Sequence, residues 1–200
     1  MERLVLCTGN PGKVAELRAL LPSDIELLSL ADVGLPADLP ETGATLEDNA
    51  LQKARFAYAR VGLPCIADDT GLEVEALNGA PGVHSARYAG EAKDPAANMA
   101  KLLRELDGRE DRTARFRTVI AYVSEGIEHT VEGEVRGAIA HAPRGTGGFG
   151  YDPVFLPEMS DLTFGELDAK RKNAISHRAQ AIWRFVRLMD GERKGAERYI

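Results

Sequence analysis

The order of elements at the start of the chain constrains the fold more than any other feature of the sequence. The apolar run "RLVLCT", residues 3–8, predicts a buried strand. The loop "GNPGK" follows, and "VAELRALL" then carries apolar residues at helical spacing until Pro22 ends the pattern. A buried strand, a glycine-rich loop and a helix form the opening of an α/β unit. The sequence therefore predicts an α/β fold.

Three later patterns extend this prediction to a sheet flanked by helices. The run "IELLSL", residues 25–30, predicts a second strand. Residues 45–62 predict a helix, with Thr45 as its N-cap and Gly62 at its end. Another helix is predicted directly after Asp94, because a capping side chain followed by proline is a typical helix start.

From residue 113 onward the pattern changes from helices to strands. Two β-rich runs within 113–139 meet around Ser124-Glu125-Gly126, which predicts an antiparallel hairpin. A last helix is predicted after Ser176, with an apolar stripe formed by Ala179, Ile182, Trp183 and Val186. We therefore expect one domain over residues 1–200 with a mixed sheet, a second lobe around the hairpin, and a frayed tail at about 191–200.

Composition limits the classes of partner. The formal net charge of −6 argues against a nucleic-acid or anionic-membrane binder, because such proteins usually carry a basic surface. A small anionic ligand needs only a local basic site and remains possible. Cys7 and Cys65 both lie in apolar runs, so we expect free thiols in a reducing cytoplasm. We expect no signal peptide, because residues 1–6 lead directly into a loop. We expect no membrane span, since no apolar run approaches about 18 residues.

The stretch "CIADDTGLEV", residues 65–74, begins with an apolar run that predicts a strand ending in two adjacent carboxylates. Asp68 and Asp69 have two interpretations. They end the strand by bonding to nearby backbone groups, or at least one of them holds a metal ion or a water. Successive strand residues point to opposite faces, so a strand that continued would separate the two carboxylates.

The loop "TGNPGK", residues 8–13, is a candidate anion site. A loop that enters a helix presents unpaired N–H groups and the positive end of the helix dipole, and Lys13 adds a mobile cation. The loop is too short for a Walker A motif, and an ordinary βα turn remains the alternative. The combination of Thr8, Asn10 and Lys13 favours an anion site that binds phosphate.

Two further residues are candidates for the chemistry. Glu41 is either a solvated loop acid or, together with Asp69, part of an oxygen-ligand set for Mg²⁺, which takes few protein carboxylates and keeps several waters. Lys53 lies within the predicted helix among alanines, where it is either solvated or borders a groove.

The most unusual stretch is "GTGGFGYDP", residues 145–153, in which glycines indicate positive φ angles or close approach of a ligand to the backbone. Phe149 either stacks on a base or packs into the core, and Asp152 either caps a turn or accepts hydrogen bonds from a ring N–H. Three cations gather around the start of the last helix, where they oppose its dipole: Lys172, His177 and Arg178. They are either solvated or bind a negative or acceptor-rich group.

Five segments in order resemble the inosine triphosphate pyrophosphatase family, whose members hydrolyse non-canonical purine nucleoside triphosphates: "TGNPGKVAEL", "ETGATLEDNA", "ADDTGLEVEALNGAPGVHSARYAG", "GTGGFGYDPVF" and "KNAISHRAQA". The resemblance covers about residues 3–190. It implies an elongated α/β fold with an active-site cleft between two lobes. It also implies hydrolysis of ITP, dITP and XTP to monophosphate and pyrophosphate, a Mg²⁺ requirement, and a homodimer.

The resemblance also implies roles for individual residues. Glu41 and Asp69 would hold the metal, Asp69 would accept the proton of the attacking water, Asp68 would support it, and Lys53 and Thr70 would position the phosphate chain. The phosphates would be held by Thr8, Gly9, Asn10, Pro11, Gly12 and Lys13. The base and sugar would be held by Phe149, Gly150, Tyr151, Asp152, Lys172, His177 and Arg178. Position 70 is often serine in the family, and Thr70 keeps the hydroxyl.

Two other functions fit parts of the same pattern. One is a related pyrophosphatase for modified pyrimidine or methylated nucleoside triphosphates. The other is a module that senses nucleotides without hydrolysing them, although a pure sensor has less use for the acid pair and Glu41. A panel of triphosphates, assayed with Mg²⁺ and with EDTA, separates these functions from the main prediction.

Overall fold

The computed structural model describes residues 2–196 and has a seven-stranded mixed sheet with the order β2-β1-β3-β5-β6-β7, in which β4 pairs with β3. The strands are β1 Glu2–Leu6, β2 Ile25–Ser29, β3 Cys65–Val74, β4 Pro81–Gly82, β5 Thr113–Ser124, β6 Ile127–Ile139 and β7 Phe155–Pro157. The α-helices are α1 Pro11–Leu20, α2 Leu46–Val61, α3 Pro95–Glu105, α4 Ala169–Ile175 and α5 His177–Ala196. The predicted α/β class with a mixed sheet is confirmed.

The chain divides into two compact units. Unit 1 comprises the described residues up to Asp69, together with Thr118–Gly133 and the described residues from Arg178 onward. Unit 2 comprises Thr70–Arg117 and Glu134–His177. Strands β3, β5 and β6 contribute residues to both units.

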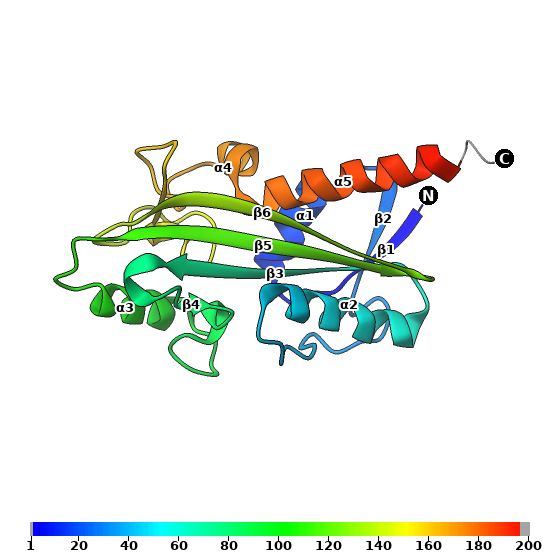
Figure 1. Ribbon diagram of the computed structural model, residues 1–200, viewed down its shortest axis with the longest axis horizontal. Coiled ribbons are helices and arrows are strands. Elements are labelled where there is room, and N and C mark those ends of the chain that lie inside the picture. The colour runs from blue at the N-terminus through cyan, green and yellow to red at the C-terminus, as the bar shows by residue number, and fades with distance from the viewer. Residues whose placement is uncertain (1, 197–200) are drawn as a thin grey trace. The chain divides into compact units, whose positions relative to one another are not determined.

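Unit 1 is built on parallel strands. β1 pairs in parallel with β2 and with β3, with Val5 opposite Cys65 in the second pair. Figure 1 shows α2 and α5 on opposite sides of these strands. Because both faces are covered, β5 is buried continuously from Thr118 to Val123, as its apolar sequence requires. Helix α2 contacts the strands through small residues, Ala50, Ala54 and Ala57.

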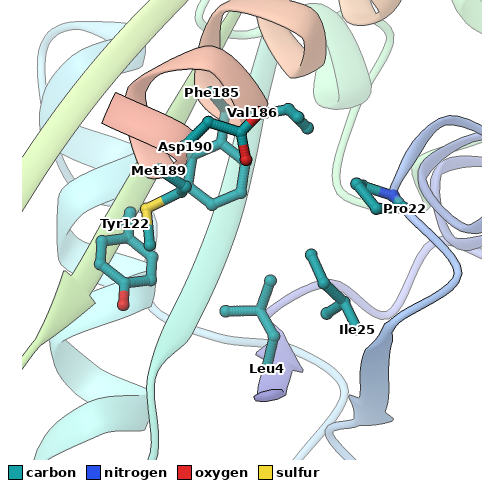
Figure 2. Close-up of a pocket in the computed structure, with 8 residues that line it drawn as sticks. All are labelled: Leu4, Pro22, Ile25, Tyr122, Phe185, Val186, Met189 and Asp190. Carbon is teal, nitrogen blue, oxygen red and sulfur yellow. The ribbon is translucent and has the colours of Figure 1, made fainter. Parts of the chain in front are cut away.

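The α5 side of unit 1 contains its main apolar cluster. Leu17 of α1, Ile66 of β3 and Phe185 of α5 are buried in it. A hollow at the edge of this cluster is almost entirely apolar, as Figure 2 shows, and its lining residues are Leu4, Pro22, Ile25, Tyr122, Phe185, Val186, Met189 and Asp190. With a single carboxylate among its lining residues, this hollow has few groups to recognise a polar ligand.

The helix ends follow local sequence rules. Thr45 accepts a hydrogen bond from the Asp48 N–H at 3.0 Å, and Gly62 ends α2 at a φ of 63°. Asp94 caps α3 by accepting from the Ala96 N–H at 2.9 Å. These predicted caps are confirmed.

Unit 2 contains a second core, formed around the aromatic rings of Phe116, Phe155 and Phe164. Leu102 of α3 is buried in the same cluster. β6 and β7 pair antiparallel, with Gly137 opposite Pro157. Tyr151 and Val154, at the end of the glycine-rich segment and directly after it, are buried in the same cluster.

The predicted hairpin is confirmed. The neighbouring strands β5 and β6 are joined by Glu125 and Gly126 alone, and Gly126 has a φ of 69°. A two-residue connection joins only antiparallel strands.

Three expectations differ from the structure. β3 does not end in the acid pair but continues through it to Val74. Helix α4 was not predicted, and Lys172 lies in it rather than at the start of the last helix. Trp183 was expected on the buried stripe of the last helix, yet it is 46% exposed.

The end of the chain departs in part from the expected frayed tail. Helix α5 continues to Ala196, and residues 197–200 lie outside the described residues. Within the described part of the chain, no helix combines the length and the apolar character that a membrane span requires.

Candidate functional site

The continuation of β3 through the acid pair decides how the two carboxylates are used. Successive residues on a strand point to opposite faces, and Asp68 and Asp69 accordingly have different side-chain partners. Both are buried, with 0% and 7% of their surface exposed. A buried carboxylate has to be paired, so its partners define its role.

Asp68 is held by cations from α1 and α5. Its Oδ2 atom lies 3.2 Å from Lys13 Nζ, and Arg178 donates to the same oxygen from both Nε and Nη2 at 3.1 Å. Arg178 Nη1 donates in turn to Glu16 of α1. Burial alone would raise the pKa of Asp68, but Lys13, Arg178 and Lys53 outweigh it and hold that pKa well below its usual range. Asp68 is therefore ionised at neutral pH.

Asp69 belongs to a cluster centred on Lys53 of α2. Lys53 Nζ lies 2.9 Å from Asp69 Oδ1 and 2.7 Å from Glu41 Oε1, and it donates to the Asp68 carbonyl oxygen at 2.8 Å. Burial raises the pKa of Asp69 above its usual value, although Lys53 and Lys13 oppose the shift. Two adjacent aspartates thus have pKa values moved in opposite directions, which is the arrangement that separates a proton acceptor from a fixed charge.

The loop that carries Glu41 is attached to α2. Gln52 Oε1 accepts from the Thr42 N–H at 2.9 Å, and Asn49 Oδ1 accepts from the Gly43 N–H at 2.8 Å. Gly43 fits closely, because a Cβ atom there would lie 2.5 Å from the Asp48 Cβ. The helix that provides Lys53 therefore also fixes the backbone beside Glu41.

Glu41 and Asp69, the two carboxylates that contact Lys53, offer oxygen ligands suited to a hard divalent cation. Among residues 2–196, no group of three or more His, Cys, Asp or Glu side chains gathers as a metal centre. Mg²⁺ does not need such a group, because it usually binds one or two carboxylates, several waters and substrate phosphates. The Lys53 ammonium shows that the position between Glu41 and Asp69 accommodates positive charge.

The loop of residues 8–13 has the predicted form. Asn10 caps α1 by accepting from the N–H groups of Gly12 and Lys13 at 2.9 and 3.2 Å, with Pro11 at the first helical position. Gly9 permits close packing, because a Cβ there would lie 2.6 Å from the Ala37 carbonyl oxygen. Burial lowers the pKa of Lys13 from its ordinary value in spite of Asp68. The loop thus places a partly buried ammonium beside the acid pair.

Unit 2 contains a second polar cluster. Asp152 Oδ2 accepts from the Phe149 N–H at 2.7 Å and from Lys172 Nζ at 2.6 Å. Lys172 Nζ also lies 4.9 Å from the centre of the Phe149 ring. Gly148 has a φ of 70°, and a Cβ there would lie 2.0 Å from Asp152 Oδ2, so only glycine fits.

The other predicted site residues of unit 2 are His177, Tyr151, Gly150 and Thr70. His177 stacks on Phe116, with ring centres 4.7 Å apart and an interplanar angle of 25°. Tyr151 Oη donates to the Ser85 carbonyl oxygen at 2.9 Å. Gly150 has a φ of 63°, and Thr70 is half-buried on β3 directly after the acid pair.

The structure groups the predicted residues by unit. Unit 1 brings together Lys13, Glu41, Lys53, Asp68, Asp69 and Arg178. Unit 2 brings together Phe149, Asp152 and Lys172. Arg178 was expected with the base-binding residues, and in the structure its guanidinium is bound to Asp68 and Glu16 in unit 1.

Sequence reasoning did not identify two residues that contact the predicted ones. Glu16 follows Lys13 by one helical turn, a spacing that places both side chains on one face of α1. Phe116 lies in the alternating part of β5 and carried no signal beyond that of a core residue. Helical spacing could therefore have identified Glu16 from the sequence, whereas no sequence pattern identifies Phe116.

Comparison with protein families gives one match of nearly full length. Residues 4–188 match the model of the Ham1 family. Among curated proteins, the dITP/XTP pyrophosphatase of Porphyromonas gingivalis is 53% identical over 183 residues, which cover 91% of this chain and 94% of that protein. The dITP/XTP pyrophosphatase of Bacillus licheniformis is 50% identical, over 95% of this chain and 99% of that protein.

Solved structures agree with these matches. The Ham1 protein of Staphylococcus aureus superposes with a TM-score of 0.87 at 39% identity, over 96% of this chain and all of that chain. The nucleoside-triphosphatase, or dITP/XTP pyrophosphatase, of Mycobacterium abscessus gives a TM-score of 0.75 at 47% identity, over 92% and 98% of the two chains.

Proposed function

This chain belongs to the Ham1 family, and on that premise we propose that it hydrolyses the non-canonical purine nucleoside triphosphates ITP, dITP and XTP. The products are the nucleoside monophosphate and pyrophosphate. The observation that carries the proposal is the identity of 46–53% to dITP/XTP pyrophosphatases over at least 90% of the chain. The reaction would remove deaminated purines from the nucleotide pool.

The basic groups of unit 1 suit the phosphate chain. A triphosphate carries close to four negative charges, and attack by water is slow because the nucleophile meets that charge. Lys13, Lys53 and the loop of residues 8–13 supply positive charge and N–H donors beside the acid pair. We assign the loop, Lys13, Lys53 and Thr70 to phosphate binding.

The acid pair suits the activation of water. Asp69, whose pKa is raised, accepts the proton of the attacking water, while Asp68 stays ionised and fixes Lys13. Glu41 and Asp69 would hold a divalent cation, which we propose is Mg²⁺. When bound, that cation neutralises charge on phosphate oxygens and lowers the pKa of a coordinated water.

The polar cluster of unit 2 suits the base and sugar, and we assign Phe149, Gly150, Tyr151, Asp152, Lys172 and His177 to that end of the substrate. Hypoxanthine and xanthine present a 6-keto acceptor where adenine presents an amino donor. Buried donors that face this oxygen would be left unpaired by adenine, and sites of that kind discriminate by roughly 10⁴-fold or more. Lys172 and His177 are the candidate donors of this cluster, and Arg178 of unit 1 is a third candidate.

Three expectations remain predictions: the homodimer, the cytoplasmic location and the cleft between two lobes. The same holds for the single domain over residues 1–200. None of them is needed for the assignment of the reaction.

The test is a panel of triphosphates with product analysis. We expect ITP, dITP and XTP to give monophosphate and pyrophosphate with Mg²⁺, no turnover in EDTA, and far slower turnover of ATP. Preferential hydrolysis of modified pyrimidine or methylated triphosphates would replace the proposed substrate class. Nucleotide binding without release of pyrophosphate would indicate a sensor instead.

A further inference from the structure

The Lys53 ammonium has the surroundings of a bound cation rather than those of a surface lysine. It is 4% exposed, and it contacts Glu41 Oε1 at 2.7 Å, the Asp68 carbonyl oxygen at 2.8 Å and Asp69 Oδ1 at 2.9 Å. Three oxygens, one from the loop of Glu41 and two from strand β3, therefore converge on a single nitrogen. Two of these oxygens belong to the carboxylates that we assign to the divalent cation.

This contact set has an electrostatic consequence. Two buried carboxylates that face the same point repel one another unless a cation lies between them. The Lys53 ammonium lies between the two carboxylates and contacts both of them. It thus offsets one of their two negative charges. A divalent cation that entered alone would have to displace an ammonium with three good acceptors.

We propose that Lys53 is a placeholder for the divalent cation: its ammonium occupies the position between Glu41 and Asp69 until the cation arrives together with the triphosphate. The inference rests on the proposed metal role of these two carboxylates. If Lys53 acts in this way, the nucleotide-free protein binds divalent cations weakly because the ammonium competes for the site.

The requirement for nucleotide follows from the burial of Lys53. A buried ammonium that leaves its acceptors must find others, because an unpaired buried charge is costly. Lys13 offers none, since it is itself a cation held by Asp68. The phosphate oxygens of the substrate are negatively charged acceptors. The Lys53 ammonium therefore binds the triphosphate when the divalent cation binds the two carboxylates. Loading of the metal is thereby coupled to binding of the substrate.

The test measures Mn²⁺ binding to the nucleotide-free protein by electron paramagnetic resonance, so it does not depend on turnover. We expect Lys53→Met to bind Mn²⁺ at least about tenfold more tightly than the wild type, because removal of one competing charge from a partly buried site is worth that much or more. Adding Glu41→Gln to Lys53→Met should abolish the gain. Binding by Lys53→Met that is no tighter than wild type would overturn the proposal.

Lys172→Met is the matched control. Lys172 is also 4% exposed and pairs with a buried carboxylate, Asp152 at 2.6 Å, but it lies in the cluster of unit 2. This variant should bind Mn²⁺ as weakly as the wild type. An equal gain in both variants would mean that the loss of any buried lysine tightens binding, and the specific role of Lys53 would be wrong.

A second measurement uses only the wild-type protein, in case Lys53→Met does not fold. Mn²⁺ affinity is measured with and without an ITP analogue that has a methylene group between its α and β phosphorus atoms. After correction for Mn²⁺ bound by the free analogue, we expect affinity to rise at least about tenfold when the analogue is bound. Equal affinity would overturn the coupling. Failure of the proposed function is distinguishable, because it would appear as absence of ITP hydrolysis in the substrate panel.

Discussion

The two aspartates of β3 should separate stability from turnover when each is changed to asparagine. Asp68→Asn removes the charge that pairs with Lys13, which is partly buried, and with Arg178, which is fully buried. Breaking a buried ion pair by removing one partner costs about 3–5 kcal/mol. Glu16 still compensates Arg178 in part, so we expect a loss of about 3 kcal/mol in the free energy of unfolding.

Asp69→Asn should behave in the opposite way. Lys53 keeps Glu41 and the Asp68 carbonyl oxygen as partners, so the loss of stability should be about 1 kcal/mol, near that of a single hydrogen bond. Turnover of ITP should be abolished, because the proposed proton acceptor is removed.

Urea unfolding followed by circular dichroism measures both variants against the wild type. For a chain of this size, 3 kcal/mol corresponds to a fall of about 6–12 °C in Tm, which a thermal scan resolves easily. Equal stability of the two variants would refute the claim that Asp68 is the structural partner of the buried cations. Near-normal turnover in Asp69→Asn would remove Asp69 from the mechanism.

Lys13→Ala should raise the KM for ITP, because it removes the partly buried ammonium that we assign to phosphate binding, and steady-state kinetics with unchanged KM and kcat would count against phosphate contact. Gly148→Ala should abolish nucleotide binding, because the added Cβ would lie 2.0 Å from Asp152 Oδ2. Its control Gly126→Ala, at a similar φ with open space and outside the assigned site, should show only the backbone strain of about 1–2 kcal/mol in unfolding, and equal binding by both variants would contradict the argument. Arg178→Ala should narrow the preference for ITP over ATP in competition assays, and a preserved ratio would mean that the base is recognised elsewhere.

Features set by neighbouring residues were predicted well from the sequence. The caps at Thr45 and Asp94 and the αL glycine at position 62 depend only on their own helix. The β5–β6 hairpin depends on two runs and one short turn. Local rules were therefore sufficient for most of the framework.

Features set by distant residues were not predicted. Two adjacent acids disfavour a strand, and β3 continues through Asp68 only because Lys13 and Arg178 neutralise it from helices far away in the sequence. Helix α4 has no apolar stripe of its own, and its buried Lys172 depends on Asp152 of another segment. No local pattern contains these partners.

The exposure of Trp183 has a simpler cause. The helical spacing of Ala179 and Ile182 fits a buried stripe that includes Trp183, and it fits equally well a stripe that includes Ala181 and Phe185. The structure buries the side that contains Ala181 and Phe185, which leaves Trp183 beyond the edge of the contact. Periodicity identifies a stripe only to within about one residue to either side.

The alternation of β3 gives two copies of the same amino acid different acid strengths. Asp68 and Asp69 are identical in covalent structure, and the side of the ribbon on which each emerges determines whether its proton is lost readily or retained longer. A protein engineer who wished to tune the acidity of one of them could therefore redesign residues on that side and leave the opposite side intact. Insertion of a single residue earlier in the strand, by contrast, would exchange the two environments at once.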